Sequence, residues 1–312
     1  MVRPILRTAR NAGMAIVAQF WVFGFALAGR VARPAARRWS SPGGQRVLVV
    51  APHPDDETIG CGGALARHRA CNDEVWIAYI TDGRRSRALG LAPEEMARRR
   101  REEAMASAAA LGIDQVEWFD LAEGEWTDEQ LRPGLQALLR RLAPQIVYAP
   151  SRVDFHPEHA CVAHVLALAL ADAPAGTRVR VYQVQVPLTF VLTNLVADIS
   201  GVIAQNDAAL HAYATQRGNI GRAIRQRRYG AALYGLNRQA EEFWELSAEQ
   251  YAMLHRDLNG WSQEAFRGLR FYPFSDPLAY LRGRAERRRL AALVRATDRR
   301  WEGSNNQSLE VK

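Results

Sequence analysis

The chain has 312 residues, of which 48% are hydrophobic and 24% are charged; this is ordinary for a globular enzyme and excludes a disordered, collagen-like or multi-span membrane protein. Its formal net charge of +8 comes from the first 46 residues, which contain eight arginines and no acidic side chain. The remaining 33 basic residues balance 33 acidic ones, so the body of the chain has no basic excess to neutralise the phosphates of a nucleic acid.

The N-terminal segment from Ala12 to Gly29 is apolar apart from Gln19 and contains four aromatic residues. As a helix it would reach about 27 Å, close to the roughly 30 Å of a bilayer core. We expect it to tether the chain to the cytoplasmic side of a membrane. A cleaved export signal is one alternative, because Ala26-Leu27-Ala28 resembles a cleavage site, and a surface helix of a soluble cytoplasmic protein is another. The segment from Arg33 to Gly44 is predicted to be a flexible, basic linker.

From Arg46 onward, short apolar segments alternate with helical patterns. The five predicted strands are Val47–Val50, Glu74–Thr81, Val116–Phe119, Gln145–Ala149 and Val179–Val184. The predicted helices between them end near Arg69 or span Pro93–Leu111, Glu129–Leu142 and Pro157–Ala171. This alternation predicts an α/β fold, a Rossmann-like doubly wound sheet that is mostly parallel and has helices on both faces.

The pattern changes after Gln185. An apolar, β-branched segment is followed by predicted helices at Ala204–Arg217, Ile220–Leu246 and Ser247–Leu258. Near the C-terminus, five arginines fall on one predicted helix: Arg282, Arg284, Arg287, Arg288 and Arg289. They are interpreted as a solvated face, with contact to anionic lipid as the alternative. The chain is therefore divided into an N-terminal helix and linker (1–45), a catalytic domain (46–217) and a helical C-terminal extension (218–312).

The loop after the first predicted strand carries candidate metal ligands. It contains His53, Asp55, Asp56 and Glu57 within five positions. A bound cation would offset the repulsion between such closely spaced carboxylates. His53 and Asp56 lie three residues apart around a tight turn, so we expect them to share a metal ion and to leave Asp55 free as a base.

The loop after the fourth predicted strand carries two more histidines. His156 and His159 lie three apart, with Pro157 at a suitable first helical position. Ligands of doubly wound sheets bind beyond the carboxyl ends of the strands, so His53, Asp56 and His159 are predicted to meet there. Two imidazoles and one carboxylate, with a fourth position for water, are the usual ligands of catalytic zinc.

These two loops resemble the signatures of the PIG-L/LmbE-like zinc-dependent de-N-acetylases. Pro52–Glu57 (PHPDDE) is similar to the family's (A/P)HPDDE segment. His156–Val162 (HPEHACV) is similar to HPDHxxV, with Glu158 in place of the usual Asp. Arg100 lies in a helix similar to the family's R-x-x-E-A pattern, and the resemblance covers roughly residues 46–217.

The resemblance implies that His53, Asp56 and His159 hold one Zn²⁺ per chain, although such ligand sets also accept iron or cobalt. It further implies that Asp55 is the general base and that His156 polarises the amide oxygen of the substrate.

Three further residues are candidate neighbours of this chemistry. Glu158 is expected to orient a histidine from the far side of the metal. Asp82 and Arg100 are expected to contact the substrate, although Asp82 also fits an ordinary turn. The glycine-rich segment Gly60–Gly63 is interpreted as close packing between a helix and the sheet, in preference to a phosphate cradle.

The expected function is removal of the acetyl group from an N-acetylated amino sugar of the N-acetylglucosamine type, with release of acetate and a free amine. The apolar N-terminus favours a lipid-linked or glycan-linked substrate. Two alternatives remain open: another metal-dependent hydrolase, such as a phosphoesterase, and a non-catalytic, membrane-tethered module that binds a sugar or a nucleotide. The sequence leaves open the acetylated sugar, the metal used in the cell and the oligomeric state.

Overall fold

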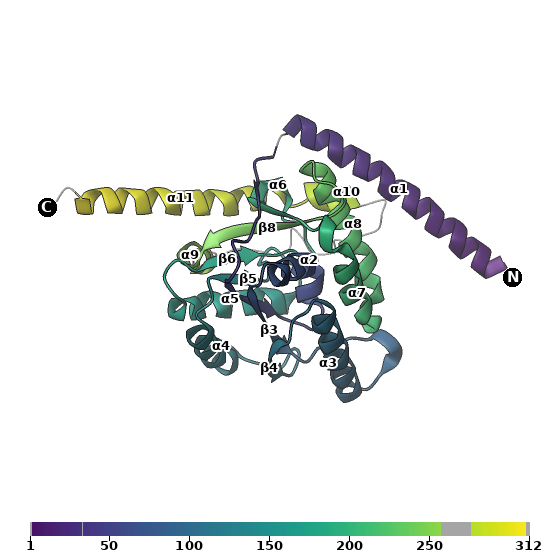
Figure 1. Cartoon of the computed structure of the whole chain (residues 1–312), viewed down its shortest axis with the longest axis horizontal. Helices are drawn as coiled ribbons and strands as arrows, with labels where there is room; N and C mark the ends of the chain where they lie inside the picture. The colour runs from purple at the N-terminus through teal and green to yellow at the C-terminus, as the bar shows by residue number, and fades with distance from the viewer. Residues whose placement is uncertain (1, 33, 257–275, 310–312) are drawn as a thin grey trace.

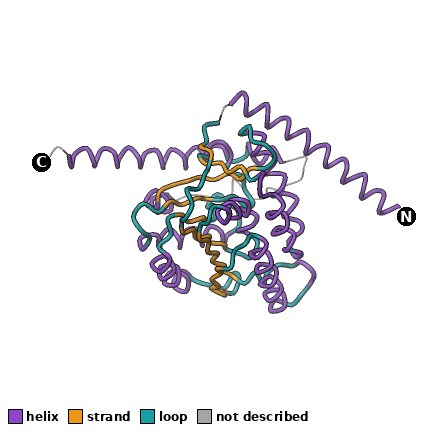
Figure 2. Tube along the Cα trace, in the orientation of Figure 1, coloured by secondary structure: helices purple, strands orange, loops and turns teal. Residues whose placement is uncertain are grey.

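A central sheet with helices on both faces forms the body of the molecule (Figures 1 and 2). This computed structural model describes residues 2–32, 34–256 and 276–309, with side chains described at 12–32, 34–255 and 276–296. The strands are β1 Arg37–Arg38, β2 Arg46–Ala51, β3 Glu74–Thr81, β4 Gln115–Leu121, β5 Ile146–Ala149, β6 Arg178–Val181, β7 Leu195–Asp198 and β8 Ala240–Ser247.

The helices fill the connections between these strands and extend beyond them at both ends of the chain. They are α1 Val2–Ala32, α2 Asp56–Ala70, α3 Pro93–Ala110, α4 Asp128–Leu142, α5 Pro157–Ala169, α6 Thr189–Leu192, α7 Ile203–Ala212, α8 Arg217–Leu233, α9 Ala248–Arg256, α10 Asp276–Leu281 and α11 Arg284–Leu309. Short 3₁₀ turns lie at Ala88–Gly90, Leu170–Asp172, Ser200–Val202 and Ala214–Gln216.

The strand order is β1-β7-β8-β6-β5-β2-β3-β4, and in the described residues every ladder is parallel except the two made by β8. Alternate residues of the central strands enter two separate cores: Leu48 and Val50 pack in the core with α4, α5 and α9, whereas Val47 and Val49 pack in the core with α2, α3 and α7. Burial on both faces explains why these strands are continuously apolar. The predicted α/β architecture, with a largely parallel sheet and a helical C-terminal segment, is confirmed.

The prediction of a single helix over Ile220–Leu246 is wrong in its second half. α8 ends at Leu233, and Ala240–Ser247 forms β8 between β6 and β7. The alanines and glutamates of this segment favour a helix intrinsically, but here two of the three glutamates are buried beside arginines: Arg227 lies 2.6 Å from Glu241, and Arg180 lies 2.9 Å from Glu245. The sheet therefore uses strands from both sides of residue 217. The predicted helix Ser247–Leu258 is found as α9, and Leu258 lies outside the described residues.

The prediction of a flexible linker before β2 is wrong at its centre. Arg37–Arg38 pairs with β7, and the side chain of Trp39 is 4% exposed. The guanidinium groups of Arg67 and Arg180 lie 4.5 and 5.4 Å from the centre of a Trp39 ring, within the range of cation–π attraction. One aromatic side chain thus orders a segment whose arginines, glycines and serines suggest a mobile chain.

A buried ion pair, Arg227 with Glu241, contacts the backbone of α2. Arg227 donates a hydrogen bond to the carbonyl oxygen of Thr58 at 2.7 Å. Its partner Glu241 accepts the backbone N–H groups of Gly63 and Ala64 at 2.9 and 2.7 Å. The pair therefore binds the backbone of α2 from outside and ties α2 to α8 and β8.

The glycines of α2 are packing residues. A Cβ at Gly60 would lie 2.3 Å from the ring of Tyr182, and one at Gly63 would lie 2.6 Å from Ile199. This close approach to the sheet confirms the packing interpretation of Gly60–Gly63.

The arginine-rich C-terminal segment is only partly a solvated face. Arg282, Arg284, Arg288 and Arg289 are exposed, but Arg287 is fully buried. Arg287 donates a hydrogen bond from Nε to the carbonyl oxygen of Pro187 at 3.0 Å. This residue anchors the start of α11 to the body of the protein.

α1 meets the length and composition of a membrane-spanning helix over Ala12–Ala32, with a mean hydropathy of 1.7, and is the single such helix among the described residues. It packs along α8. The Phe25 ring stacks on Tyr229 with centroids 4.9 Å apart, and Gly29 lies directly against the carbonyl group of Leu233. Figure 1 shows α1 and α11 projecting from opposite sides of the body.

Candidate active site

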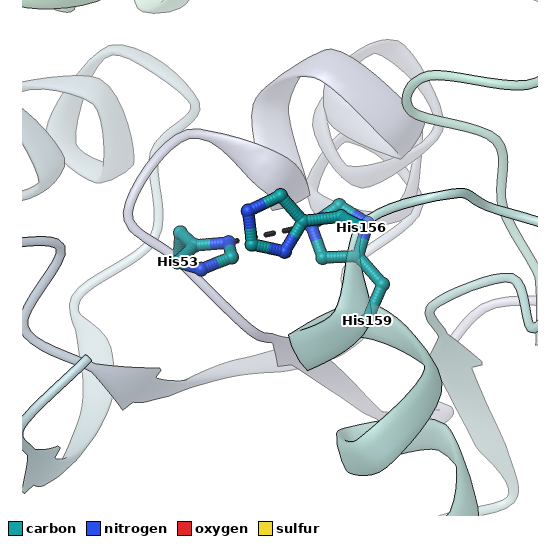
Figure 3. A group of neighbouring side chains, drawn as sticks. All are labelled: His53, His156 and His159. Carbon is teal, nitrogen blue, oxygen red and sulfur yellow. Dashed lines mark hydrogen bonds between the residues drawn. The ribbon is translucent and has the colours of Figure 1, made fainter. Parts of the chain in front are cut away.

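Two loops that are about 100 residues apart in sequence meet at the carboxyl edge of the sheet. His53 and Asp56 follow β2, and His159 lies in the first turn of α5 after β5. Asp56 Oδ2 lies 3.1 Å from both His53 Nδ1 and His159 Nε2, and the two ring nitrogens are 3.3 Å apart. All three side chains are buried. Figure 3 shows the rings of His53 and His159 directed toward each other, with His156 beside them.

This triangle of atoms fits a metal ion. Tetrahedral ligands 2.0–2.2 Å from zinc lie about 3.3–3.6 Å from one another, close to the three separations observed here. Two imidazole nitrogens and a carboxylate oxygen are also the donor types that such an ion takes. The predicted set of His53, Asp56 and His159 is therefore brought together.

Acidic residues hold the outer nitrogens of both imidazoles. Glu158 Oε2 lies 2.5 Å from His53 Nε2, and Asp154 Oδ2 lies 3.2 Å from His159 Nδ1. Glu158 also accepts the indole N–H of Trp126 at 2.9 Å. Carboxylates in this position fix the orientation of a metal-binding histidine. The expectation that Glu158 orients a histidine has its structural counterpart in this contact with His53.

The three central groups carry strongly shifted pKa values in the metal-free protein. Burial opposes protonation of His53, but its hydrogen bonds to Asp56 and Glu158 outweigh burial and raise the pKa to about 9. Burial likewise opposes protonation of His159, and the carboxylates of Asp56 and Asp154 raise its pKa well above the usual value. The pKa of Asp56 is held well below its usual range by the two histidines, despite burial. Charged forms thus gather where a divalent ion would replace the protons.

His156 is the N-cap residue of α5, and its ring lies 4.7 Å from that of His53 between centroids. Burial, followed by the nearby His159 and His53, lowers the pKa of His156 to about 4. Its Nδ1 is buried and has no hydrogen-bond partner in the described structure. At neutral pH His156 is therefore a neutral imidazole, which keeps one N–H as a hydrogen-bond donor.

Asp55 lines the same cavity as the triangle, and its carboxyl group pairs with Arg100. It is the N-cap residue of α2 and has a φ of 129°, a backbone conformation that residues other than glycine rarely adopt. Its Oδ1 lies 2.9 Å from Arg100 Nη2. Burial raises the pKa of Asp55 to about 7, although Arg100 opposes the shift. A carboxyl group with this pKa both accepts and releases a proton near neutral pH.

Arg100 belongs to a run of four arginines on α3, of which it alone is buried. Arg98 pairs with Glu102 at 2.6 Å, and Arg101 pairs with Asp120 at 2.8 Å on the surface. The helical register therefore selects one member of the run for the site. Arg100 also donates to the carbonyl oxygen of Pro54 and so holds the loop that carries Asp55.

Two adjoining cavities open at the site. The first, of about 240 Å³, is lined by the triangle, by Asp55, Arg100 and His156, and by Gly83, Arg85, Ser86, Glu123, Val184, Gln185, Gln216 and Asn219. The second, of about 490 Å³, shares Arg85, Glu123 and His156 with the first and adds Trp126, Asp128 and Cys161, among others. Together they offer room beside the triangle for a group larger than one sugar ring.

Sequence reasoning missed most of these lining residues. Ser86, Glu123 and Gln185 follow β3, β4 and β6, so extending the strand-end rule to every parallel strand would have found them. Asp82 is not among the residues that line either cavity. Its carboxylate instead binds Arg84 Nε at 2.6 Å and the backbone N–H of Glu123 at 3.3 Å, which favours the turn interpretation.

Glu57, the remaining acid of the first loop, is turned away from the triangle. It is fully buried and accepts hydrogen bonds from Thr58 Oγ1 at 2.5 Å and from the Tyr213 hydroxyl at 2.7 Å. These contacts stabilise the first turn of α2, so Glu57 supports the loop without being a ligand candidate.

The comparisons with known proteins agree with this geometry. A family model described as "PIG-L: GlcNAc-PI de-N-acetylase" matches residues 48–170. The diacetylchitobiose deacetylase of Thermococcus kodakarensis is 31% identical over 120 residues, which cover 37% of this chain and 45% of that protein. The chain spans about half the length of the curated relatives it matches, from 45% to 66% for the first three.

Solved structures share the fold at low sequence identity. An N,N'-diacetylchitobiose deacetylase from Pyrococcus horikoshii superposes with a TM-score of 0.60 at 22% identity, covering 66% of this chain and 85% of that one. A 4-carboxy-2-hydroxymuconate hydratase from Pseudomonas putida KT2440 superposes with a TM-score of 0.56, also at 22% identity, covering 65% and 96%. Because a hydratase shares the fold, the side chains of the site must decide between chemistries.

Proposed function

We propose, from the match of residues 48–170 to the PIG-L family model, that the chain is a metal-dependent hydrolase that removes the acetyl group from an N-acetylated amino sugar. The observation that carries the proposal is the meeting of His53, Asp56 and His159 within 3.3 Å, with the carboxyl group of Asp55 alongside. The products would be acetate and a free amine.

His53 Nδ1, Asp56 Oδ2 and His159 Nε2 would hold one zinc ion per chain, and iron or cobalt would suit the same donors. When bound, the ion supplies Lewis acidity, which would polarise the acyl oxygen and lower the pKa of a water molecule toward neutral pH.

Asp55 is proposed as the general base. It would accept a proton from the attacking water and later deliver it to the departing amine. The pKa of about 7 suits both steps, because a base must release what it has taken up at the same pH. Arg100 keeps the carboxyl group in place through its contacts with Asp55 and Pro54.

His156 is proposed to donate an N–H to the acyl oxygen as negative charge develops there. Because its pKa is lowered to about 4, the donor is the neutral ring. One donor in this position is typically worth about 3–4 kcal/mol of transition-state stabilisation.

The amide-bearing sugar is proposed to occupy the smaller cavity, and the group attached to it the larger one. Trp126 offers a ring face there, while Glu123 and Asp128 offer hydrogen-bond acceptors. An aromatic face beside acidic groups suits a second sugar ring. The names of the family model and of the Thermococcus relative, which refer to GlcNAc-PI and to diacetylchitobiose, support a conjugate of N-acetylglucosamine as substrate.

We further propose that α1 attaches the protein to the cytoplasmic side of a membrane, which would give access to a lipid-linked or glycan-linked amino sugar. The support is the apolar composition of Ala12–Ala32 and the absence of acidic residues from the first 46 positions of the sequence.

A second candidate, a two-metal phosphoesterase, has one supporting observation. His53, Glu123 and Glu158 form another group of potential ligands beside the first. Two-metal sites place their ions about 3.5–4 Å apart, and one group would have to share His53 with the other. Two metal ions per chain would favour this candidate, and one would favour the deacetylase.

The test combines elemental analysis with an acetate-release assay on a panel of N-acetylglucosamine conjugates. We expect one metal ion per chain, lost in His159→Ala, and acetate release that disappears with it. Full acetate release by metal-free His159→Ala would refute the proposal. Tight binding of the conjugates without turnover would instead identify a sugar-binding module.

A further inference from the structure

Large apolar side chains are exposed mainly at one end of the molecule. Eleven such residues are exposed in the described part of the chain, and eight of them lie on α1, α6 and α10. α10 contacts α1 through Tyr280 and Phe25, and α6 contacts the start of α11 through Phe190 and Arg284; Figure 1 shows where these helices lie. These eight are Ile16, Phe20, Phe23, Leu27, Val31, Phe190, Leu278 and Leu281. Their concentration marks an interaction surface, because soluble surfaces seldom gather so many large apolar groups.

The five residues on α1 form one stripe. Their spacing of four, three, four and four positions places them on a single side of the helix. The opposite side of α1 is occupied by the body of the protein: Ala18 is 4% exposed there, and Phe25 stacks on Tyr229. α1 therefore presents its outer stripe while its inner side is already packed.

α10 is fixed beside α1 by polar and aromatic contacts. Asp276 Oδ2, at the start of α10, accepts hydrogen bonds from Arg225 Nε at 2.7 Å and from the Tyr229 hydroxyl at 3.0 Å. Tyr280 of α10 packs on Phe25 of α1 with centroids 4.6 Å apart. Through these contacts α1, α8 and α10 form one block, from which Leu278 and Leu281 project into solvent.

Exposed arginines adjoin the apolar residues. Arg282 follows Leu281 directly and Arg284 lies two residues further on; the guanidinium of Arg284 lies 5.6 Å from the centre of the Phe190 ring. Basic side chains next to large apolar ones are the combination that binds the surface of an anionic bilayer.

We propose that α1, α6, α10 and the start of α11 form a membrane-binding face, and that α1 lies along the bilayer surface instead of crossing it. This inference rests on the membrane attachment proposed above. A crossing helix would have to leave α8, since the guanidinium of Arg228 is hydrogen-bonded to Gln19 Oε1 at 2.5 Å and would be carried into hydrocarbon. Lying flat keeps every contact with α8 and buries the whole stripe.

The orientation also brings the catalytic cavity near the lipid. Asn219, near the start of α8, lines the smaller cavity, and Tyr229, ten residues later, contacts α1. Ten helical residues span about 15 Å, which is within reach of an amino sugar carried on a lipid.

The first experiment measures binding of the full chain to vesicles of equimolar phosphatidylglycerol and phosphatidylcholine. The variant is Leu278→Asp/Leu281→Asp, and the matched control is Met105→Asp/Leu168→Asp, which adds two charges at exposed apolar positions elsewhere. We expect at least a tenfold weaker partition for the variant and less than a twofold change for the control. Equal loss of binding in both, or no loss in the variant, would overturn the proposal. No loss would mean that α1 binds the membrane without α10.

A second experiment asks whether docking of α1 is required. A Cβ at Gly29 would lie 2.0 Å from the carbonyl oxygen of Leu233, whereas one at Gly24 meets only Trp21 at 3.6 Å. Gly29→Leu should therefore release α1 from α8. We expect the effect of the two α10 substitutions to disappear in Gly29→Leu and to persist in Gly24→Leu. An effect that persists in both would contradict a joint face.

Topology is tested by labelling with a membrane-impermeant maleimide in sealed vesicles. Ala12→Cys and Ser40→Cys lie at exposed positions on either side of the apolar segment, in a background carrying Cys71→Ser and Cys161→Ser; the remaining Cys61 is buried. We expect both sites to be labelled. Protection of one would show a crossing helix and overturn the proposal.

Two further outcomes separate the membrane-binding face from a dimer interface and from the proposed deacetylase activity. A dimer in solution that Phe20→Asp dissociates, combined with no vesicle binding, would assign the face to a second copy of the chain and overturn the proposal. Acetate release is assayed separately in detergent. Vesicle binding as expected without any acetate release would refute the deacetylase and leave the membrane face supported.

Discussion

Glu158 Oε2 lies 2.5 Å from His53 Nε2, on the side of the ring opposite Asp56, so one imidazole is held between two carboxylates. The resemblance to known deacetylases predicts an aspartate at position 158. Here the longer side chain of glutamate contacts His53 through Oε2, while its Oε1 accepts the indole N–H of Trp126.

Removing this contact should weaken metal binding. We expect Glu158→Gln to lower zinc affinity by about 10–100-fold, as loss of a carboxylate behind a metal-binding histidine usually does. Competition with a chelator measures the affinity. The control is Glu125→Gln, which changes an exposed glutamate in the loop between β4 and α4. Unchanged affinity in Glu158→Gln would show that the contact does not position the ring.

Replacing the proposed base should separate chemistry from metal binding. We expect Asp55→Asn to reduce the rate of acetate release by about 10²–10⁴-fold while the metal content stays at one ion per chain. Asp114→Asn is the control, because Asp114 is exposed and lies between α3 and β4. It should leave the rate of acetate release unchanged. Full activity in Asp55→Asn with zinc bound would show that another group takes the proton.

The stability of the metal-free protein should fall as pH rises from 7 to 9. His53 has its pKa raised from 6.5 to about 9 in the folded chain, so its contribution to stability is full below pH 6.5 and is lost as pH passes through 9. Zinc binds the neutral ring, so the additional stabilisation by zinc should grow over the same range. Thermal unfolding with and without zinc at pH 7, 8 and 9 measures both trends. A metal-free midpoint that is independent of pH would contradict the assignment. In His53→Asn the midpoint should fall less steeply with pH, because only the contribution of His159 remains.

Breaking the ion pair between Arg227 and Glu241, which contacts the backbone of α2, should lower the free energy of unfolding markedly. Arg227→Met leaves Glu241 buried and unpaired, and we expect a loss of about 3–5 kcal/mol in the free energy of unfolding. Urea denaturation measures it. Arg141→Met removes a surface pair, with Glu117 at 2.5 Å, and should change the same quantity by less than about 1 kcal/mol. Equal effects in the two variants would show that burial does not set the energetics of the pair.

The ring of Trp126 should matter for disaccharides and not for single sugars. We expect Trp126→Ala to raise the KM for diacetylchitobiose about tenfold relative to that for N-acetylglucosamine, because stacking on the ring is lost. Trp126→Phe also loses the hydrogen bond to Glu158 but keeps a ring, so it should retain the preference. A parallel decline for both substrates in Trp126→Ala would place the second sugar elsewhere.

The meeting of His53 and His159 was predictable from sequence because both follow apolar strands of a parallel sheet, whose carboxyl ends share one edge. Arg100 was predictable only through the resemblance, since a run of four arginines hides which one faces inward. Asp154 carried no motif, and its contact with His159 depends on loop shape. Local patterns do not encode that shape.

The largest error, a helix predicted where β8 lies, has a specific physical cause. Glu241 and Glu245 are buried beside arginines that are distant in sequence, and a buried charged residue looks like a solvent-facing one until its partner is known. Trp39 misleads in the opposite way, because one aromatic side chain organises a segment of otherwise loop-like composition.

The φ of 129° at Asp55 implies that stability and catalytic rate make opposite demands on the residue at that position. Glycine would adopt this conformation without strain, so the backbone geometry alone would favour Asp55→Gly as the more robust protein. Selection for a carboxyl group there accepts a permanently strained bend. A search for heat-resistant variants that ignores catalysis would therefore be drawn to the residue proposed as the general base.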